Sequence, residues 1–464
     1  MKKIYSIFLL ISIISITQPN LVSAQVNVQD SIALVAIYNS MGGAHWRSSI
    51  NWLTTAPVQQ WEGITVQNNR VVTVQLGSYN LNGILPAEIG YLTHVEKFDL
   101  RENHNISGTI PPEIGNMKNL KELFIYNSKL TGSIPHEIGK LKMLEALYFN
   151  GDLLTGSLPA EIGYLTNLET IDVHYNRLSD TLPRQLGNLK NISTLSLSSN
   201  NFTGSIPVQL KNLTNLVWLD LSRNQLTGKI PSGLGDLSIL NYLDLSFNKL
   251  EGFIPTHIAD LPSNLRIYLN NNNFTFAGMV RIDKRFYKPA YSPQATIPMH
   301  YNNNILSVSV GGILAFNTYN WYKNGTLYQT ITGDSTLPVN ESGSYYVVAT
   351  SHQAPKLTLY SDTINYTMGN NLIATNLSNK NLSASLYPNP VKENATLTFY
   401  AQGKYTIKVV DFSGKLMQIR TGIAVNGEKN MLQLDASKFA NGLYMVTISD
   451  EKNNNQILKI NKSN

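Results

Sequence analysis

Residues 213–236 read "LTNLVWLDLSRNQLTGKIPSGLGD", and close variants of this phrase recur along half of the chain. A proline marks each of eight repeats, at positions 86, 111, 135, 159, 183, 207, 231 and 255. The first step between these prolines is 25 residues and the next six steps are 24 residues. A fixed period of this length indicates a solenoid, because one unit cannot bury its apolar side alone whereas stacked units share a continuous core.

Side-chain alternation predicts a short strand at the start of each unit. Leu219 and Leu221 would point into the core while Asp220 points outward. Asn224 follows at a position where its amide can bond the backbone of the turn and form a ladder with its neighbours. Nine strands are expected, centred near Gln75, Asp99, Phe124, Tyr148, Asp172, Ser196, Asp220, Asp244 and Tyr268.

The phrases "GTIPPEIG", "GSIPHEIG" and "GSLPAEIG" resemble the plant-specific class of leucine-rich repeats, with its pattern LxGxIPxxIGxL. The resemblance covers residues 71–274 and implies a repeat domain over 71–278 with a parallel β-sheet on its concave face. Residues 25–70 resemble the N-terminal cap of the same class, with a helix from Asp30 to about Met41.

Three tryptophans, Trp46, Trp52 and Trp61, would close the open end of the core in this cap. Family caps usually carry a cysteine pair, but Gln59 and Val66 occupy those places here and the chain has no cysteine. We therefore expect tryptophan packing alone to stabilise the cap. The absence of cysteine also excludes disulfides, thiolate metal sites and a lipid anchor attached to an N-terminal cysteine.

Residues 1–24 have the pattern of a secretory signal peptide, with two lysines, an apolar run and the sequence Val22-Ser23-Ala24. The apolar run is shorter than the ~20 residues that a transmembrane helix needs, and no later segment is apolar enough to cross a membrane. The formal net charge of +6 is spread over 464 residues, which excludes a basic surface of the kind that binds nucleic acid.

Residues 279–367 are expected to form a connector, up to Pro293, and an immunoglobulin-like β-sandwich. Asn324-Gly325 predicts a hairpin, and Trp321 would be the core tryptophan. Glu341 and Tyr345 have the spacing of the tyrosine corner of such sandwiches. Residues 368–384 are rich in Asn and Ser and predict a flexible linker.

The last segment, 385–464, resembles the C-terminal sorting domain of type IX secretion cargo in Bacteroidetes. Alternating strands and turns predict a small antiparallel sandwich. The resemblance implies passage to the outer cell surface through the type IX secretion machinery, and removal of the domain there. The positions that match the family motif are Pro388, Asn389, Pro390, Gly414, Lys415, Gly442 and Tyr444.

No known catalytic, nucleotide-binding or metal-binding motif occurs, and the eight histidines never fall at a metal-ligand spacing. We therefore expect no catalytic residue, no cofactor and no metal. Asp220 and Asp244 would lie one strand spacing apart. The sequence "LDLS" is common in these repeats, however, and indicates a row of consensus surface residues. An accessory hydrolase would need paired carboxylates in a pocket, and we expect no such pair near the aromatic residues described next.

Several repeats replace the small polar residues of the concave face by aromatic ones. Phe124 and Tyr148 should stand about 5 Å apart, because equivalent positions of adjacent units are one strand spacing apart. Since tyrosine and tryptophan are enriched at recognition sites, this face is predicted to bind a protein or peptide, with a glycan as the alternative ligand. A purely structural surface role would leave the rings unexplained. The candidate ligand-binding residues are Phe124, Tyr126, Tyr148, His174, Tyr175, Trp218 and Tyr242.

Overall fold

The computed structural model describes residues 26–367 and, towards the C-terminus, 384–387, 391, 393–399, 403–411, 415–424, 430–451 and 455–462. The chain divides into two compact units, and the division falls between Thr363 and Ile364. The predicted signal peptide, nearly all of the predicted linker and four of the sorting-motif residues (Pro388, Asn389, Pro390 and Gly414) lie outside the described residues.

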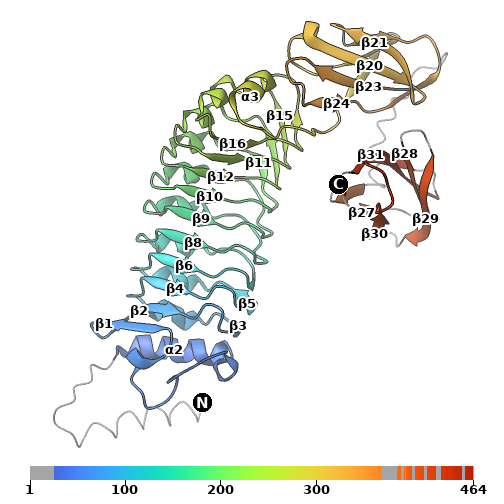
Figure 1. Ribbon diagram of the computed structural model, residues 1–464. Helices are drawn as coiled ribbons and strands as arrows, with labels where there is room; N and C mark the ends of the chain where they lie inside the picture. The colour runs from blue at the N-terminus through green and yellow to red at the C-terminus, as the bar shows by residue number, and fades with distance from the viewer. Residues whose placement is uncertain are drawn as a thin grey trace, which may run out of the picture. The chain divides into compact units, whose positions relative to one another are not determined.

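The first unit begins with a solenoid built on a ten-stranded sheet (Figure 1). Nine strands are parallel and correspond to the nine predicted ones, while β1 pairs antiparallel with β2 at the edge. The predicted centres are in fact the last residues of the strands, because the chain soon bends through a left-handed residue, such as Arg223 with φ 54°. The strands are β1 (Ile64–Gln67), β2 (Arg70–Gln75), β4 (Lys97–Asp99), β6 (Glu122–Phe124), β8 (Ala146–Tyr148), β9 (Thr170–Asp172), β10 (Thr194–Ser196), β12 (Trp218–Asp220), β14 (Tyr242–Asp244) and β16 (Arg266–Tyr268).

A row of 3-10 turns stacks on the other side of the core, and each turn begins directly after one of the eight repeat prolines. Proline suits this place because its fixed φ leads into the turn and no N–H is needed there. The turns are η4 (Ala87–Tyr91), η5 (Pro112–Asn116), η6 (His136–Lys140), η7 (Ala160–Tyr164), η8 (Arg184–Asn188), η9 (Val208–Asn212), η10 (Ser232–Asp236) and η11 (Thr256–Asp260). Short parallel strands flank them: β3 (Asn82–Ile84), β5 (Asn105–Thr109), β7 (Lys129–Thr131), β11 (Thr203–Ser205), β13 (Gln225–Gly228), β15 (Lys249–Gly252) and β17 (Asn273–Phe274).

A buried ladder of asparagine side chains links successive units. The amide nitrogen of Asn224 donates to the carbonyl oxygens of Leu197, Leu221 and Ser222 at 3.0, 3.2 and 3.1 Å. Its amide oxygen accepts from the backbone N–H of Phe202 at 3.0 Å. Since a buried polar group without a partner is costly, each amide stabilises its turn and the adjacent unit together. The ladder residues are Asn103, Asn176, Asn200, Asn224, Asn248 and Asn272.

Ser128 and Asp152 interrupt this ladder in two consecutive units. One carboxylate oxygen of Asp152 accepts from the backbone N–H of Ser128 at 2.9 Å and from the hydroxyl of Ser128. The other oxygen, Oδ2, is buried and has no hydrogen-bond partner among the described residues. In the next unit the amide nitrogen of Asn176 donates to the carbonyl of Phe149 at 2.7 Å. A ladder side chain therefore needs a hydrogen-bond donor at the place that Oδ2 occupies in Asp152. Burial raises the pKa of Asp152 to about 7.

The N-terminal cap holds the predicted helix, α2 (Val28–Ser40), which begins two residues earlier than expected, and the turns η2 (Gly43–His45) and η3 (Val58–Gln60). Trp46, Trp52 and Trp61 are buried against the core, as predicted. The expectation that tryptophan packing alone stabilises the cap is wrong. The fully buried carboxylate of Asp30 accepts from the Arg70 guanidinium at 2.8 and 2.9 Å and from the N–H of Val71 at 2.8 Å.

The segment expected to be a connector packs as a second cap. Helix α3 (Met279–Arg285) buries Met279 and Ile282. Gln294 then continues the asparagine ladder: its side chain accepts from the N–H of Asn272 at 3.1 Å and donates to the carbonyl of Leu269 at 2.9 Å. A glutamine side chain therefore completes the hydrogen bonds of the last repeat.

Antiparallel sheets follow, in the orders β18-β19-β22 and β21-β20-β23-β24. Asn324 and Gly325 form the predicted two-residue hairpin, both with positive φ. The Tyr345 hydroxyl donates to the carbonyl of Glu341 at 2.8 Å, which is the predicted tyrosine corner, and Trp321 is fully buried. The elements are β18 (Met299–Asn302), β19 (Ile305–Val308), η12 (Leu314–Phe316), β20 (Asn317–Lys323), β21 (Thr326–Thr332), β22 (Thr336–Pro338), β23 (Gly343–Ser351), β24 (Thr358–Tyr360) and β25 (Ile364–Tyr366).

The second unit is also antiparallel, with sheets in the orders β26-β27-β30 and β29-β28-β31-β32. Leu397, Val409 and Val446 lie in its core. The hydroxyl of Tyr444 donates to the carbonyl of Ala440 at 2.8 Å, the same four-residue span as in the first unit. The strands are β26 (Ala384–Tyr387), β27 (Asn394–Phe399), β28 (Gly403–Asp411), β29 (Leu416–Ala424), β30 (Asn430–Asp435), β31 (Gly442–Asp450) and β32 (Asn455–Lys462).

Asp152→Asn is expected to stabilise the protein at neutral and alkaline pH. An unfolded aspartate has a pKa of about 3.9, so the raised pKa of the folded state makes this group favour folding most at low pH, and that contribution is lost as pH rises through about 7. Asparagine does not ionise and supplies the missing donor. Thermal unfolding at pH 8 should show a gain of about 4 kcal/mol, since folding raises the pKa from about 3.9 to about 7 and one pKa unit corresponds to about 1.4 kcal/mol.

At pH 4 the two proteins should be nearly equally stable. Asp236→Asn, at an exposed position of η10, is the matched control and should change nothing at either pH. Identical pH dependence of stability in the Asp152→Asn and unmodified proteins would contradict this account of the ladder.

Candidate functional site

The outward-pointing side chains of the ten-stranded sheet, which we call the sheet face, form rows across the repeats. Each strand pairs with the next in one register, so equivalent positions lie about 4.8 Å apart. The row at the strand ends reads Asp99, Phe124, Tyr148, Asp172, Ser196, Asp220, Asp244 and Tyr268.

Three of the predicted residues meet in one aromatic group: Phe124, Tyr126 and Tyr148. The ring centroids of Phe124 and Tyr148 are 5.1 Å apart, close to the predicted spacing, and those of Tyr126 and Tyr148 are 6.2 Å apart. The rings are inclined to one another by 44° and 49°, so they present both edges and faces. All three are half-buried. Lys97 adds a cation 5.2 Å from the centre of the Phe124 ring.

His174 and Tyr175 lie in the next unit, with ring centroids 5.1 Å apart. His174 follows the end of β9 by two residues and bonds through Nδ1 to the carboxylate of Asp172, the last residue of that strand. Tyr175 lies in the turn after the strand with φ 53°, and 62% of it is exposed. This residue therefore belongs to the edge of the sheet face and not to the strand.

Trp218 and Tyr242 form a second aromatic group with Tyr268, which the sequence reasoning did not include as a binding residue. The rings of Trp218 and Tyr242 stack in parallel, 3.6 Å apart with 2° between their planes. Tyr268 is 5.5 Å from Tyr242 and could have been found from the same register. Asp220 and Asp244 are register partners beside these rings, as predicted, and they do not line the hollow described next.

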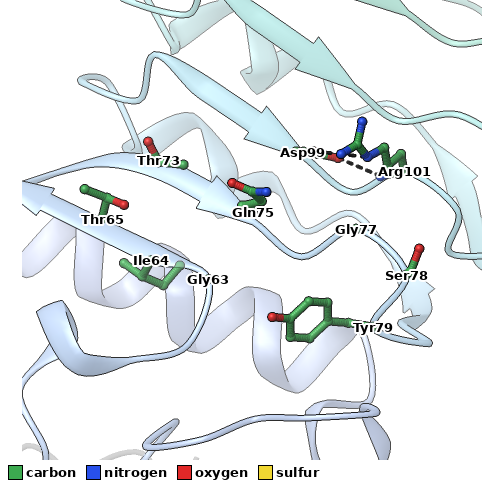
Figure 2. Close-up of a pocket in the computed structure, with 10 residues that line it drawn as sticks. All are labelled: Gly63, Ile64, Thr65, Thr73, Gln75, Gly77, Ser78, Tyr79, Asp99 and Arg101. Atoms are coloured by element: carbon green, nitrogen blue, oxygen red, sulfur yellow. Dashed lines mark hydrogen bonds and ion pairs between the residues drawn. The ribbon is translucent and has the colours of Figure 1, made fainter.

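A polar hollow of about 350 Å³ opens at the N-terminal edge of the sheet face, where β1 and β2 meet the unit of β4 (Figure 2). The carboxylate of Asp99 is fully buried, and its Oδ2 lies 3.4 Å from Nε of Arg101. Burial raises the pKa of Asp99, and Arg101 partly opposes that shift. Gly77 leaves the hollow open, because a Cβ there would come within 3.2 Å of Asp99. The lining residues are Gly63, Ile64, Thr65, Thr73, Gln75, Gly77, Ser78, Tyr79, Asp99 and Arg101.

Sequence reasoning missed this hollow because β1 helps to line it by pairing antiparallel beside β2 at the edge of the sheet, which no repeat pattern encodes. Register places Asp99 beside Phe124, so the hollow adjoins the first aromatic group. Within the described part of the chain, no group of three or more His, Cys, Asp or Glu residues could hold a metal ion. The same residues include no helix long and apolar enough to cross a membrane.

Comparison with known families identifies both kinds of sequence motif. The family described as "Secretion system C-terminal sorting domain" matches residues 385–462. Leucine-rich-repeat families match residues 166–226 and, in a second form, residues 119–141 and 240–261. Three residues of the predicted sorting motif lie in the described part of the second unit. The backbone N–H of Lys415 donates to the side chain of Asp411 at 3.0 Å, Gly442 begins β31, and Tyr444 is buried.

One similar solved structure is the leucine-rich-repeat ectodomain of the Arabidopsis thaliana receptor kinase GASSHO1/SCHENGEN3, in complex with CASPARIAN STRIP INTEGRITY FACTOR 2. Its sequence is 32% identical to this chain, and the match covers 49% of this chain and 30% of that chain with a TM-score of 0.44. The ectodomain of the Arabidopsis receptor kinase HAESA, in complex with a peptide hormone, is 33% identical over 53% and 42%, with a TM-score of 0.48. A plant ice-binding protein is 24% identical over 54% and 88%, with a TM-score of 0.45. The chain spans less than half of the length of the two receptor structures.

Proposed function

We propose that this chain, a leucine-rich-repeat protein with a type IX secretion sorting domain, is exported to the outer cell surface or beyond and binds a protein or peptide there through its sheet face. The sorting domain carries the proposal of export. The clustering of aromatic side chains on the sheet face carries the proposal of binding.

Aromatic rings on a regular surface leave apolar area in contact with water, and tyrosine and tryptophan dominate the binding energy of many interfaces. Here the rings gather in contacting groups and do not occur singly. Their positions are fixed by the hydrogen bonds of the sheet and by the ladder beneath it, so little freedom remains to be lost on binding. Trp218, with 38% of its surface exposed, offers the largest side chain of the sheet face.

A protein or peptide suits this surface better than a glycan. A sugar ring stacks on one flat ring face, whereas Phe124, Tyr126 and Tyr148 are inclined to one another and present edges as well. Charges of both signs surround them, including the Lys97–Glu122 pair at 2.7 Å and the Asp99–Arg101 pair. Such mixed polarity is common in protein interfaces, which combine an aromatic core with a polar rim.

Hydrolysis is not supported by the carboxylates of the second aromatic group. Asp220 and Asp244 stand on the open sheet face and not in the hollow at Asp99. One oxygen of each already accepts a backbone hydrogen bond, from Ser222 at 3.0 Å and from Ser246 at 2.8 Å. They serve as surface groups whose charge faces a ligand.

Phe124→Ser combined with Tyr148→Ser should abolish capture of the binding partner from cell-surface extracts by the immobilised mature protein. Loss of a central aromatic side chain typically costs about 2 kcal/mol or more of binding, roughly thirtyfold in affinity. Because both rings are only half-buried and lie outside the repeat core, the melting temperature should change by only a few degrees. Calorimetry on the same preparations separates lost binding from lost folding.

Tyr91→Ser combined with Tyr164→Ser is the matched control, because these tyrosines are 45% and 56% exposed on the 3-10 turns of the opposite face. This control should capture the partner normally. Normal capture by the Phe124/Tyr148 variant would overturn the assignment of the first aromatic group. Recovery of a polysaccharide and no protein would favour the glycan alternative.

Deletion of residues 385–464 should leave a folded protein trapped in the periplasm. The deleted segment forms strands that pair within the second unit and has its own core, so its loss should not open the repeats. Fractionation of cells followed by immunodetection measures where the shortened protein accumulates. Normal amounts of it at the cell surface would show that the sorting role is wrong.

A further inference from the structure

The second aromatic group combines an exposed indole with two carboxylates that have no ionic partner. Trp218 is held rigidly by its parallel stack on Tyr242. Asp220 lies two residues further along the same strand, on the same face, and pairs in register with Asp244 of the neighbouring strand. None of the ion pairs between described residues involves Asp220 or Asp244.

Other acidic residues of the sheet face each have a basic side chain as partner. Asp99 pairs with Arg101, Glu122 with Lys97, and Asp172 with His174. By contrast, Asp220 and Asp244 place two like charges about one strand spacing apart, an arrangement that a cation between them would relieve. The repulsion from Asp220 adds to burial in raising the pKa of Asp244.

The hydrogen bonds of Asp220 leave one of its two carboxylate oxygens for such a cation, whereas both oxygens of Asp244 accept hydrogen bonds. Oδ1 of Asp220 accepts from the N–H and hydroxyl of Ser222 at 3.0 and 2.7 Å, while Oδ2 takes part in no hydrogen bond among the described residues. In Asp244, Oδ1 accepts from the N–H of Ser246, and Oδ2 lies 3.3 Å from the Tyr242 hydroxyl. The carboxylates are thereby fixed in position.

We propose that Trp218, Asp220 and Asp244 form a subsite for a lysine or arginine side chain of the ligand. The methylene chain and cation would lie against the indole, with the cation beside the carboxylates. Cation–π attraction is strongest for tryptophan and favours organic cations. A divalent metal would need about six oxygen ligands, and two carboxylates next to an indole offer too few. The subsite rests on the proposed function, since it assumes a peptide or protein ligand with a basic residue.

Trp218 provides its own probe of this subsite. It is one of five tryptophans, and the other four, Trp46, Trp52, Trp61 and Trp321, are 7% exposed or less. A solute that changes the indole NMR signal or fluorescence of an exposed tryptophan therefore reports on residue 218. The probe is the blocked hexapeptide acetyl-Gly-Gly-Lys-Arg-Gly-Gly-amide, compared with the same peptide carrying glutamine in place of both basic residues.

The basic peptide should shift the Trp218 signal of the mature protein saturably at low salt, and the glutamine peptide should not. Asp220→Asn with Asp244→Asn should weaken binding of the basic peptide at least tenfold, and added salt should weaken it in the unmodified protein. The control is Asp236→Asn with Asp260→Asn, two exposed positions on the 3-10 turns, which should bind as the unmodified protein does.

Equal responses to the two peptides, or unchanged binding by the Asp220/Asp244 variant, would overturn the subsite. Since asparagine keeps the shape and the acceptor oxygen of aspartate, the variant should fold, and its indole spectrum without peptide verifies this. The titration uses no natural partner. Its failure therefore leaves the capture result for Phe124 and Tyr148 standing, and failure of capture leaves the titration standing.

Discussion

The hydrogen bonds of one asparagine side chain per repeat fix the distance and register between units, and the rest of the repeat region depends on them. Each amide satisfies carbonyls of its own turn and of the preceding unit, as Asn224 does with Leu221 and Leu197. A shift of one unit against the next would leave several buried polar groups without partners. The equal length of the repeats and this ladder together place equivalent outward side chains in rows. A change of residue type in adjacent repeats therefore creates a continuous patch of surface.

The ladder is weakest beneath the part of the surface that departs furthest from the repeat pattern. Ser128 and Asp152 replace its asparagines in the two units that present Phe124, Tyr126 and Tyr148. The buried Oδ2 of Asp152 lacks a partner among the described residues, which is a cost in stability that the neighbouring units do not carry. Functional surfaces commonly carry such local departures from the most stable sequence. Towards the other end, where Asn224, Asn248 and Asn272 are all present, the second aromatic group rests on an intact ladder.

Periodicity was sufficient to predict the repeat strands and the spacing of Phe124 and Tyr148, because these features repeat from unit to unit. Features that occur once were missed. The Asp30–Arg70 ion pair joins residues of the cap that no pattern relates, and Gln294 replaces a ladder asparagine by another residue type, two residues short of the 24-residue spacing after Asn272. The hollow at Asp99 depends on the antiparallel pairing of β1 beside β2 at the edge of the sheet. The stack of Trp218 on Tyr242 follows from register, but its parallel geometry depends on side-chain rotamers that sequence does not specify.

Binding through the sheet face requires that this face, and not the face of the 3-10 turns, contacts the partner. Two exposed tyrosines allow a direct test: Tyr175 at the edge of the sheet face and Tyr164 on η7, 62% and 56% exposed. Each is replaced in turn by a photoreactive phenylalanine analogue in the mature protein, which is then irradiated with cell-surface extracts. The account predicts a covalent adduct of defined mass from position 175 and none from position 164. An adduct from position 164 alone, or equal adducts from both positions, would contradict it.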